Sequence, residues 1–172
     1  GIPGYLRYWD QEKDVSCNIK ELFLTPEGTF YAEAQNYLKN SLRELMVYNT
    51  VLSVMTEGAT RLNAIYEATG FSRAKISVYL KNLMQLGVVQ KVESLDIECN
   101  DQPLKGIYRI SDPLIHFWYR FVFPNQSLLQ QEGPEAFYET CISTYFYHYT
   151  APYFQKVCVQ YLEIMNQYHK LP

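Results

Sequence analysis

The sequence lacks the patterns that would identify a membrane protein or a familiar enzyme. Its 172 residues contain no apolar run close to the roughly 20 residues that span a bilayer, and no secretory signal at the start. The phosphate-binding patterns G-x-x-x-x-G-K-[ST] and G-x-G-x-x-G are absent, as are the hydrolase pattern G-x-S-x-G and the zinc pattern H-E-x-x-H. We therefore expect a protein without membrane contact and without catalytic residues of its own.

Cysteine is sparse and shows no metal-binding or disulfide pattern. The four residues are far apart, with no C-x-x-C pair and no histidine at ligand spacing: Cys17, Cys99, Cys141 and Cys158. The three histidines are isolated from one another: His116, His148 and His169. This usage is typical of reduced thiols in a cytoplasmic protein, and it predicts neither a metal site nor a catalytic histidine.

Charge is low, and its distribution is more informative than its total of −3. Residues 1–59 carry 5 basic and 8 acidic side chains, residues 60–110 carry 7 and 5, and residues 111–172 carry 3 and 5. The basic stretch is 61–81, where Glu67 is accompanied by four cations: Arg61, Arg73, Lys75 and Lys81. Because phosphates attract basic surfaces, a nucleic-acid contact is expected in this stretch.

Aromatic residues are abundant, at 16% of the chain, and include 16 tyrosines. They are concentrated after Pro134, so we expect them either to pack back on the rest of the chain or to belong to a domain completed elsewhere. The sequence begins Gly1-Ile2-Pro3 without an initiator methionine, which we interpret as a piece of a longer polypeptide.

Apolar residues recur at helical spacing over most of the chain, which predicts a mainly α fold. Helices are expected over 15–24, 31–39, 41–57, 60–70, 72–87, 112–123, 135–149 and 152–168, with 128–133 as a short connection. Thr60, Ser72 and Asp112 are the expected N-caps, and Pro113 and Pro152 suit first turns. Alternating residues in 88–94 and 106–111 predict a β-hairpin.

The order of three helices and a hairpin within residues 41–111 is that of a winged helix-turn-helix, with the hairpin as the wing. Residues 1–40 and 112–172 flank it as N-terminal helices and an aromatic-rich helical extension. The third helix has cations and amides opposite its apolar stripe, as a helix that contacts phosphates and base edges requires. The predicted DNA-binding residues are Arg61, Arg73, Lys75, Val78, Lys81, Asn82 and Gln85.

Other interpretations fit the same pattern. Lysine, asparagine and glutamine are common on solvated helices, and the wing tip contains residues that would repel phosphate: Asp96, Glu98 and Asp101. The winged helix is then a protein-interaction or intramolecular regulatory module. A third interpretation is a stand-alone winged-helix transcription regulator that dimerises through its C-terminal helices.

Several strings resemble the C-terminal half of the archaeal-type P-loop ATPases, which are prokaryotic AAA-like or STAND-like proteins. They are GIPGYL (1–6), TRL (60–62), SVYLKNL (77–83), KGIYRISD (105–112) and FWYRFVFPN (117–125). The resemblance implies an upstream ATPase core that holds ATP and Mg²⁺, a helical lid that includes residues 1–40, a winged helix and the start of an endonuclease-like domain. Gly1, Ile2 and Pro3 then correspond to the nucleotide-proximal motif of the lid.

Within this resemblance, YFQKVCVQYL (153–162) corresponds to a helix of the endonuclease-like domain. Gln155 stands where the family commonly has a metal-side glutamate, and we expect the strands with the other acidic residues to lie beyond this sequence. A metal-dependent nuclease needs clustered carboxylates, so nuclease activity is not expected here. The leading hypothesis is a non-catalytic regulatory and DNA-binding region of a prokaryotic ATPase, with double-stranded DNA, the ATPase core and a second copy of the chain as expected partners.

Overall fold

The computed structural model describes residues 3–92 and 106–168, and these residues are mainly helical with one two-stranded sheet. The mainly α prediction is therefore confirmed. Asp96, Glu98 and Asp101, predicted at the tip of a wing, and also Gly1 and Ile2, lie outside the described residues. The elements, with η for 3₁₀ or π-helical segments, are η1 (Pro3–Tyr8), α1 (Val15–Ile19), η2 (Lys20–Leu24), α2 (Glu33–Ser41), α3 (Leu45–Thr56), α4 (Leu62–Thr69), α5 (Arg73–Gln85), β1 (Val89–Val92), β2 (Ile107–Ile110), α6 (Pro113–Phe117), η3 (Trp118–Val122), η4 (Phe123–Asn125), α7 (Gln126–Phe137), η5 (Tyr138–Ser143) and α8 (Thr144–Gln167).

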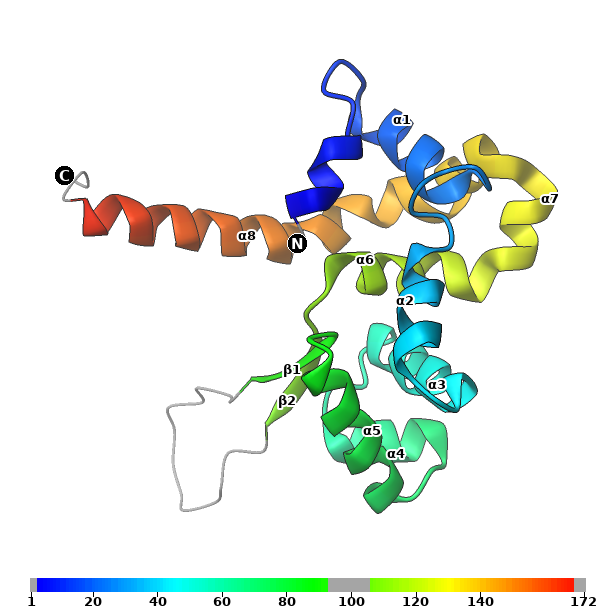
Figure 1. Ribbon diagram of the computed structural model, residues 1–172, viewed down its shortest axis with the longest axis vertical. Coiled ribbons are helices and arrows are strands. Elements are labelled where there is room, and N and C mark those ends of the chain that lie inside the picture. The colour runs from blue at the N-terminus through cyan, green and yellow to red at the C-terminus, as the bar shows by residue number, and fades with distance from the viewer. Residues whose placement is uncertain (1–2, 93–105, 169–172) are drawn as a thin grey trace.

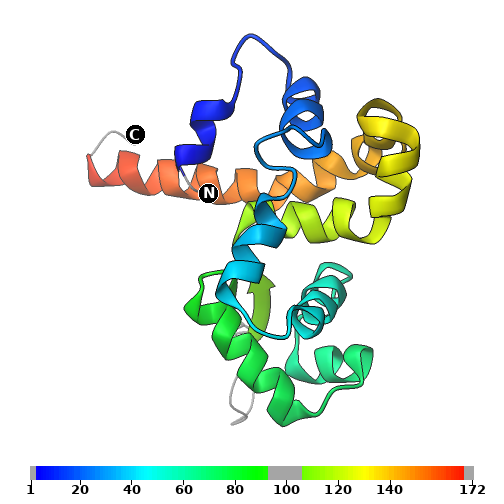
Figure 2. The same ribbon diagram turned by 45° about the vertical axis from the view of Figure 1, so that its right-hand side comes forward.

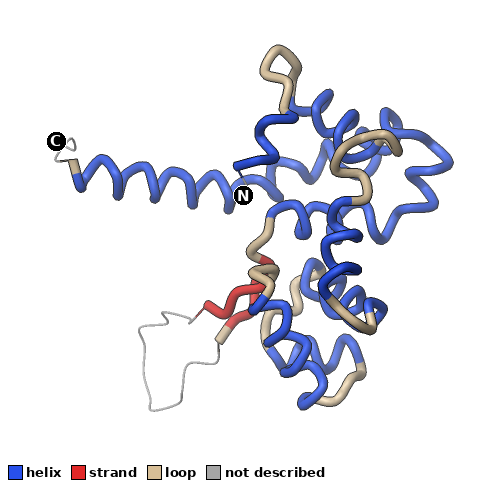
Figure 3. Tube along the Cα trace, in the orientation of Figure 1, coloured by secondary structure: helices blue, strands red, loops and turns tan. Residues whose placement is uncertain are grey.

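The elements are arranged in two halves (Figure 1). One half contains α3, α4, α5 and the two strands, which Figure 3 shows beside the helices. The other half contains η1, α1, η2, α6, α7 and the beginning of α8, and α2 lies between the halves (Figure 2). One hydrophobic core includes buried residues of both halves, so the two are packed together.

Local sequence signals explain the helices of the first half. The Ser72 hydroxyl accepts a hydrogen bond from a backbone amide in the first turn of α5, as predicted. Gly70 ends α4 with φ of 70°, and Gly87 follows α5 with φ of 72°, a region that favours glycine. The buried stripe of α5 is Ile76, Leu80 and Leu83.

The hairpin is joined to both α4 and α5. Its strands pair antiparallel, with Val89 opposite Ile110. The Tyr108 amide donates to the carbonyl of Thr60 at 2.7 Å, which holds β2 against the start of α4. The prediction of Thr60 as an N-cap is wrong: Arg61 occupies that position and its side chain makes no capping bond.

The segment from α6 to η3 forms the junction between the halves. Its side chains are almost all buried, with Arg120 exposed: Leu114, Ile115, Phe117, Trp118, Tyr119, Phe121 and Val122. The Tyr119 hydroxyl donates to Asn49 Oδ1 of α3 at 2.5 Å. Asp112 accepts from the amide of Ile115 and caps α6, as predicted.

The C-terminal helices differ from the prediction at two places. Residues 128–133, expected as a connection, belong to α7, whose helical backbone is interrupted at Gly133 with φ of 76°. Pro152, expected in the first turn of a separate helix, lies inside α8. Proline removes one hydrogen bond but its φ is helical, so the turns on either side continue the helix across it. The distal part of α8 extends away from both halves (Figure 1).

The N-terminal segment packs mainly on the C-terminal helices. The Lys20 ammonium lies 2.7 Å from a carboxylate oxygen of Glu135, and the ring of Phe23 lies 5.3 Å from that of Phe117. The Tyr37 hydroxyl of α2 also donates to a carbonyl at the end of α5, at 3.0 Å. The N-terminal segment therefore contacts the C-terminal helices directly, and α2 links it to α5.

Candidate functional site

The exposed side of α5 is the first candidate site. Val78 is 55% exposed, and Arg73, Lys81 and Gln85 are also exposed. The Arg73 guanidinium lies 5.2 Å from the ring centroid of Tyr66 in α4, which places it at the turn between α4 and α5. These four predicted residues therefore share the solvent-facing surface of the α4–α5 unit.

Lys75 differs from the other predicted cations because it is half-buried. Its ammonium lies 4.8 Å from the ring centroid of Phe71 and 5.7 Å from that of Tyr79. Contacts between a cation and aromatic faces are attractive and fix the side chain in place. The charge of Lys75 is thus held between α5 and the turn that precedes it.

Asn82 and Tyr79 connect α5 to the beginning of α3. The Asn82 amide donates to the Tyr48 hydroxyl at 2.8 Å, so this side chain is partly used in packing. The Tyr79 hydroxyl donates to Glu44, and this bond raises the pKa of Tyr79 to about 12. Glu44 has φ of 57° and ψ of 46°, a left-handed conformation that is uncommon for a residue with a side chain. A carboxylate therefore lies at the edge of the predicted DNA-binding surface.

A hollow of about 440 Å³ lies at this edge and is lined by Ser41, Leu42, Arg43, Glu44, Tyr48, Val78, Tyr79, Asn82, Gln85 and Leu86. It contains charges of both signs, and Arg43 is exposed there. Sequence reasoning did not find this hollow because the segment 41–44 meets α5 only in the folded chain.

Arg61 is placed apart from the other predicted residues. It precedes α4, whereas Arg73 begins the helix that follows the end of α4. The bond between the Tyr108 amide and Thr60 puts Arg61 beside the hairpin. Of the predicted lid motif, Pro3 begins η1, and Gly1 and Ile2 lie outside the described residues.

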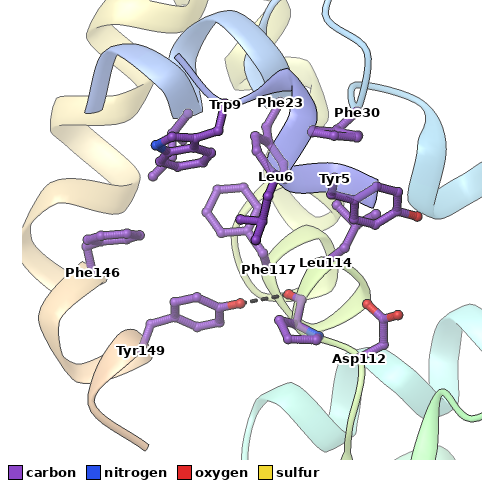
Figure 4. Close-up of a pocket in the computed structure, with 12 residues that line it drawn as sticks. Tyr5, Leu6, Trp9, Phe23, Phe30, Asp112, Leu114, Phe117, Phe146 and Tyr149 are labelled. Carbon is purple, nitrogen blue, oxygen red and sulfur yellow. Dashed lines mark hydrogen bonds between the residues drawn. The ribbon is translucent and has the colours of Figure 1, made fainter. Parts of the chain in front are cut away.

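A second candidate site is a pocket of about 390 Å³ in the other half of the molecule (Figure 4). Its lining is mostly aromatic and comes from η1, α1, η2, α6 and α8 and from residues in the connections next to them. The residues are Tyr5, Leu6, Trp9, Ile19, Phe23, Phe30, Asp112, Pro113, Leu114, Phe117, Phe146 and Tyr149. Sequence reasoning missed this pocket, although the many aromatic residues near the beginning of the chain and after Asp112 were a signal.

His116 has a packing role. Burial, and then the charge of Arg120, lower its pKa from 6.5 to about 4, so the ring is neutral at pH 7. Its Nδ1 lies 2.6 Å from the Tyr153 hydroxyl and so joins α6 to α8. Elsewhere in the described residues, Cys17, Cys141 and Cys158 are free thiols. His, Cys, Asp and Glu do not gather there in groups of three or more that could hold a metal ion.

The chain is similar to a protein family and to a protein of an archaeon. Residues 118–172 match a family described as archaeal and bacterial proteins of unknown function. The chain is also 29% identical over 177 residues to an uncharacterized protein of Methanocaldococcus jannaschii, an alignment that covers 100% of this chain and 38% of that protein. No solved structure matches the chain significantly. Within residues 3–92 and 106–168, no helix has both the length and the apolarity that a bilayer crossing requires.

Proposed function

We propose that α3, α4, α5 and the hairpin form a winged helix that contacts double-stranded DNA through the exposed side of α5. The observation that carries this proposal is that Arg73, Val78, Lys81 and Gln85 are all exposed on the same helix, α5. Cations at such a surface contact phosphates, while an amide and an apolar side chain suit base edges and thymine methyl groups. Lys75 and Asn82 have partners within the protein and would contribute less.

We further propose that this unit is a non-catalytic regulatory region of a larger ATP-binding protein. The resemblance to archaeal-type ATPases supports this role, and the alignment that covers only 38% of the relative is compatible with it. ATP and Mg²⁺ would bind the ATPase core, with Gly1, Ile2 and Pro3 near the nucleotide. Association with the ATPase core and with a second copy of the chain also stays a prediction.

A titration of a short fluorescein-labelled DNA duplex, followed by fluorescence anisotropy, tests the DNA contact. The logarithm of the binding constant should fall linearly with the logarithm of salt concentration, with a slope of about −0.9 for each phosphate contacted. Lys81→Ala should weaken binding and reduce the magnitude of that slope by about 1. Lys75→Ala should have a smaller effect, because that lysine is already held by two aromatic rings.

The matched control is Lys156→Ala, because Lys156 is exposed on α8, which is not part of the α3–α5 half. This variant should bind DNA like the unchanged protein. Absence of binding at low salt, or equal weakening by the Lys81 and Lys156 substitutions, would contradict the proposal.

A protein contact through the same surface is the second candidate function. It is favoured by Glu44, which lies beside Tyr79 and would repel phosphate. Glu44→Gln distinguishes the candidates because it removes a negative charge and leaves the amide oxygen as an acceptor for Tyr79. It should strengthen DNA binding if α5 contacts DNA, whereas a protein-interaction module would show no DNA binding with either residue.

A further inference from the structure

The aromatic pocket has the size and composition of a small-molecule site. Its volume of about 390 Å³ falls within the range of about 300–1,000 Å³ that is usual for such sites. Figure 4 shows Trp9, Phe23, Phe117, Phe146 and Tyr149 around the cavity, from segments at both ends of the sequence. An apolar ligand body would displace water from these ring surfaces on binding.

The hydroxyl groups of the two tyrosines that line the pocket are already hydrogen-bonded within the protein. The Tyr149 hydroxyl donates to the carbonyl of Pro113 at 2.7 Å, and the Tyr5 hydroxyl donates to Glu33 at 3.1 Å. The rings therefore contribute mainly carbon surface to the pocket. The faces of such rings carry partial negative charge and attract organic cations.

The charge around the pocket is negative. Asp112 is the charged residue in the lining, and none of the three ion pairs among residues 3–92 and 106–168 includes it. Its Oδ1 accepts from the Ile115 amide at 3.0 Å, which fixes the carboxylate at the start of α6. Burial, then Glu33 and to a lesser extent Asp112, raise the pKa of Tyr5. Burial, then Tyr153 and to a lesser extent Asp112, raise the pKa of Tyr149. A negative charge therefore lies in the lining where α6 begins.

We propose that this pocket binds a small organic cation with an apolar body, of the alkylammonium or arylammonium class. The aromatic lining takes the apolar body, and the Asp112 carboxylate and the ring faces hold the positive charge. An anionic or strongly polar ligand does not fit, because the lining offers no cation to pair with it. The site is separate from α5, so this proposal does not depend on the DNA-binding proposal.

Trp9 provides a direct measurement because its indole lines the pocket, whereas the other tryptophan, Trp118, is only 3% exposed. Phenyltrimethylammonium is the probe, and tert-butylbenzene is its neutral counterpart of the same shape. We expect saturable quenching of Trp9 fluorescence, with the cation bound about tenfold more tightly than the neutral compound, and isothermal titration calorimetry should give the same order.

Asp112→Asn removes the negative charge and keeps the oxygen that caps α6. It should clearly reduce the preference for the cation, leaving only the part that the ring faces supply, while binding of the neutral compound stays unchanged. Asp14→Asn is the matched control: Asp14 caps α1 by accepting from the Cys17 amide at 2.7 Å, and it is not part of the lining. This control should retain the full preference.

Three results would overturn the proposal. The first is the absence of saturable binding by both compounds. The second is equal or tighter binding of the neutral compound, which would assign the pocket to an apolar ligand or protein segment. The third is an unchanged cation preference in the Asp112→Asn protein, since the carboxylate would then contribute nothing to recognition.

Discussion

We expect the protein to lose stability between about pH 7 and about pH 5, because His116 must stay neutral in the folded chain. Most carboxylates are still ionised in this pH range. The pKa of His116 is about 4 in the folded chain and 6.5 without burial, so the unfolded chain takes up more protons between these values. A folded pKa below the unfolded one gives stability that is present above pH 6.5 and is lost as the pH falls toward 4. Linkage between these two pKa values gives a loss of about 2 kcal/mol between about pH 7 and about pH 5.

Urea unfolding followed by circular dichroism at both pH values measures this loss. The ring faces Tyr149 and Tyr153 of α8 and lies near Arg120, so no carboxylate is among the groups that shift its pKa. His116→Gln removes the titration and should flatten most of the pH dependence. His148→Gln, at an exposed position on α8, should preserve it. Equal pH dependence in the unchanged protein and the His116 variant would refute the assignment.

Three further tests concern the packing and capping, and each is measured by urea unfolding at pH 7. Leu80→Ala, at a side chain that is 1% exposed, should lower the free energy of unfolding by about 2–5 kcal/mol, and a loss below about 1 kcal/mol would contradict its place in the core. Tyr119→Phe should cost about 1 kcal/mol because it removes the bond from a buried hydroxyl to the half-buried Asn49, and Asn49→Ala added to it should cost less than the sum of the single losses. Ser72→Ala should cost about 1 kcal/mol as a lost N-cap, while Ser77→Ala on the exposed side of α5 should cost nothing.

The sequence predicts the elements whose signals are local. Ser72 and Gly87 mark the ends of the region containing α5, and alternating apolar residues mark the two strands, so these elements appear where expected. Pro152 was misleading because a single proline weakens a helix without ending it when the neighbouring turns are intact. The expected N-cap at Thr60 failed for a different reason, since its carbonyl is used by the hairpin.

The candidate sites could be predicted only in part, because they depend on contacts between distant segments. The cations of α5 follow from helical spacing, but the bond between Glu44 and Tyr79 depends on how the chain enters α3. The aromatic pocket forms only where η1, α6 and α8 lie side by side in the folded chain. The residue pattern within a single segment does not predict which other segments it will contact. Phe23 beside Phe117 is such a contact.

The helix α8 is packed against the rest of the protein at its beginning but not at its end. It follows Ile142, which is fully buried, yet none of its own residues is buried, and Phe154 is 70% exposed. Its distal turns can open without disturbing the core, so their amide hydrogens should exchange through local opening, while those near Ile142 should require a much larger opening. A hydrogen-exchange profile should therefore show protection that declines steadily along α8. The free energy needed to unfold the distal turns of α8 is then smaller than that needed to unfold its first turns.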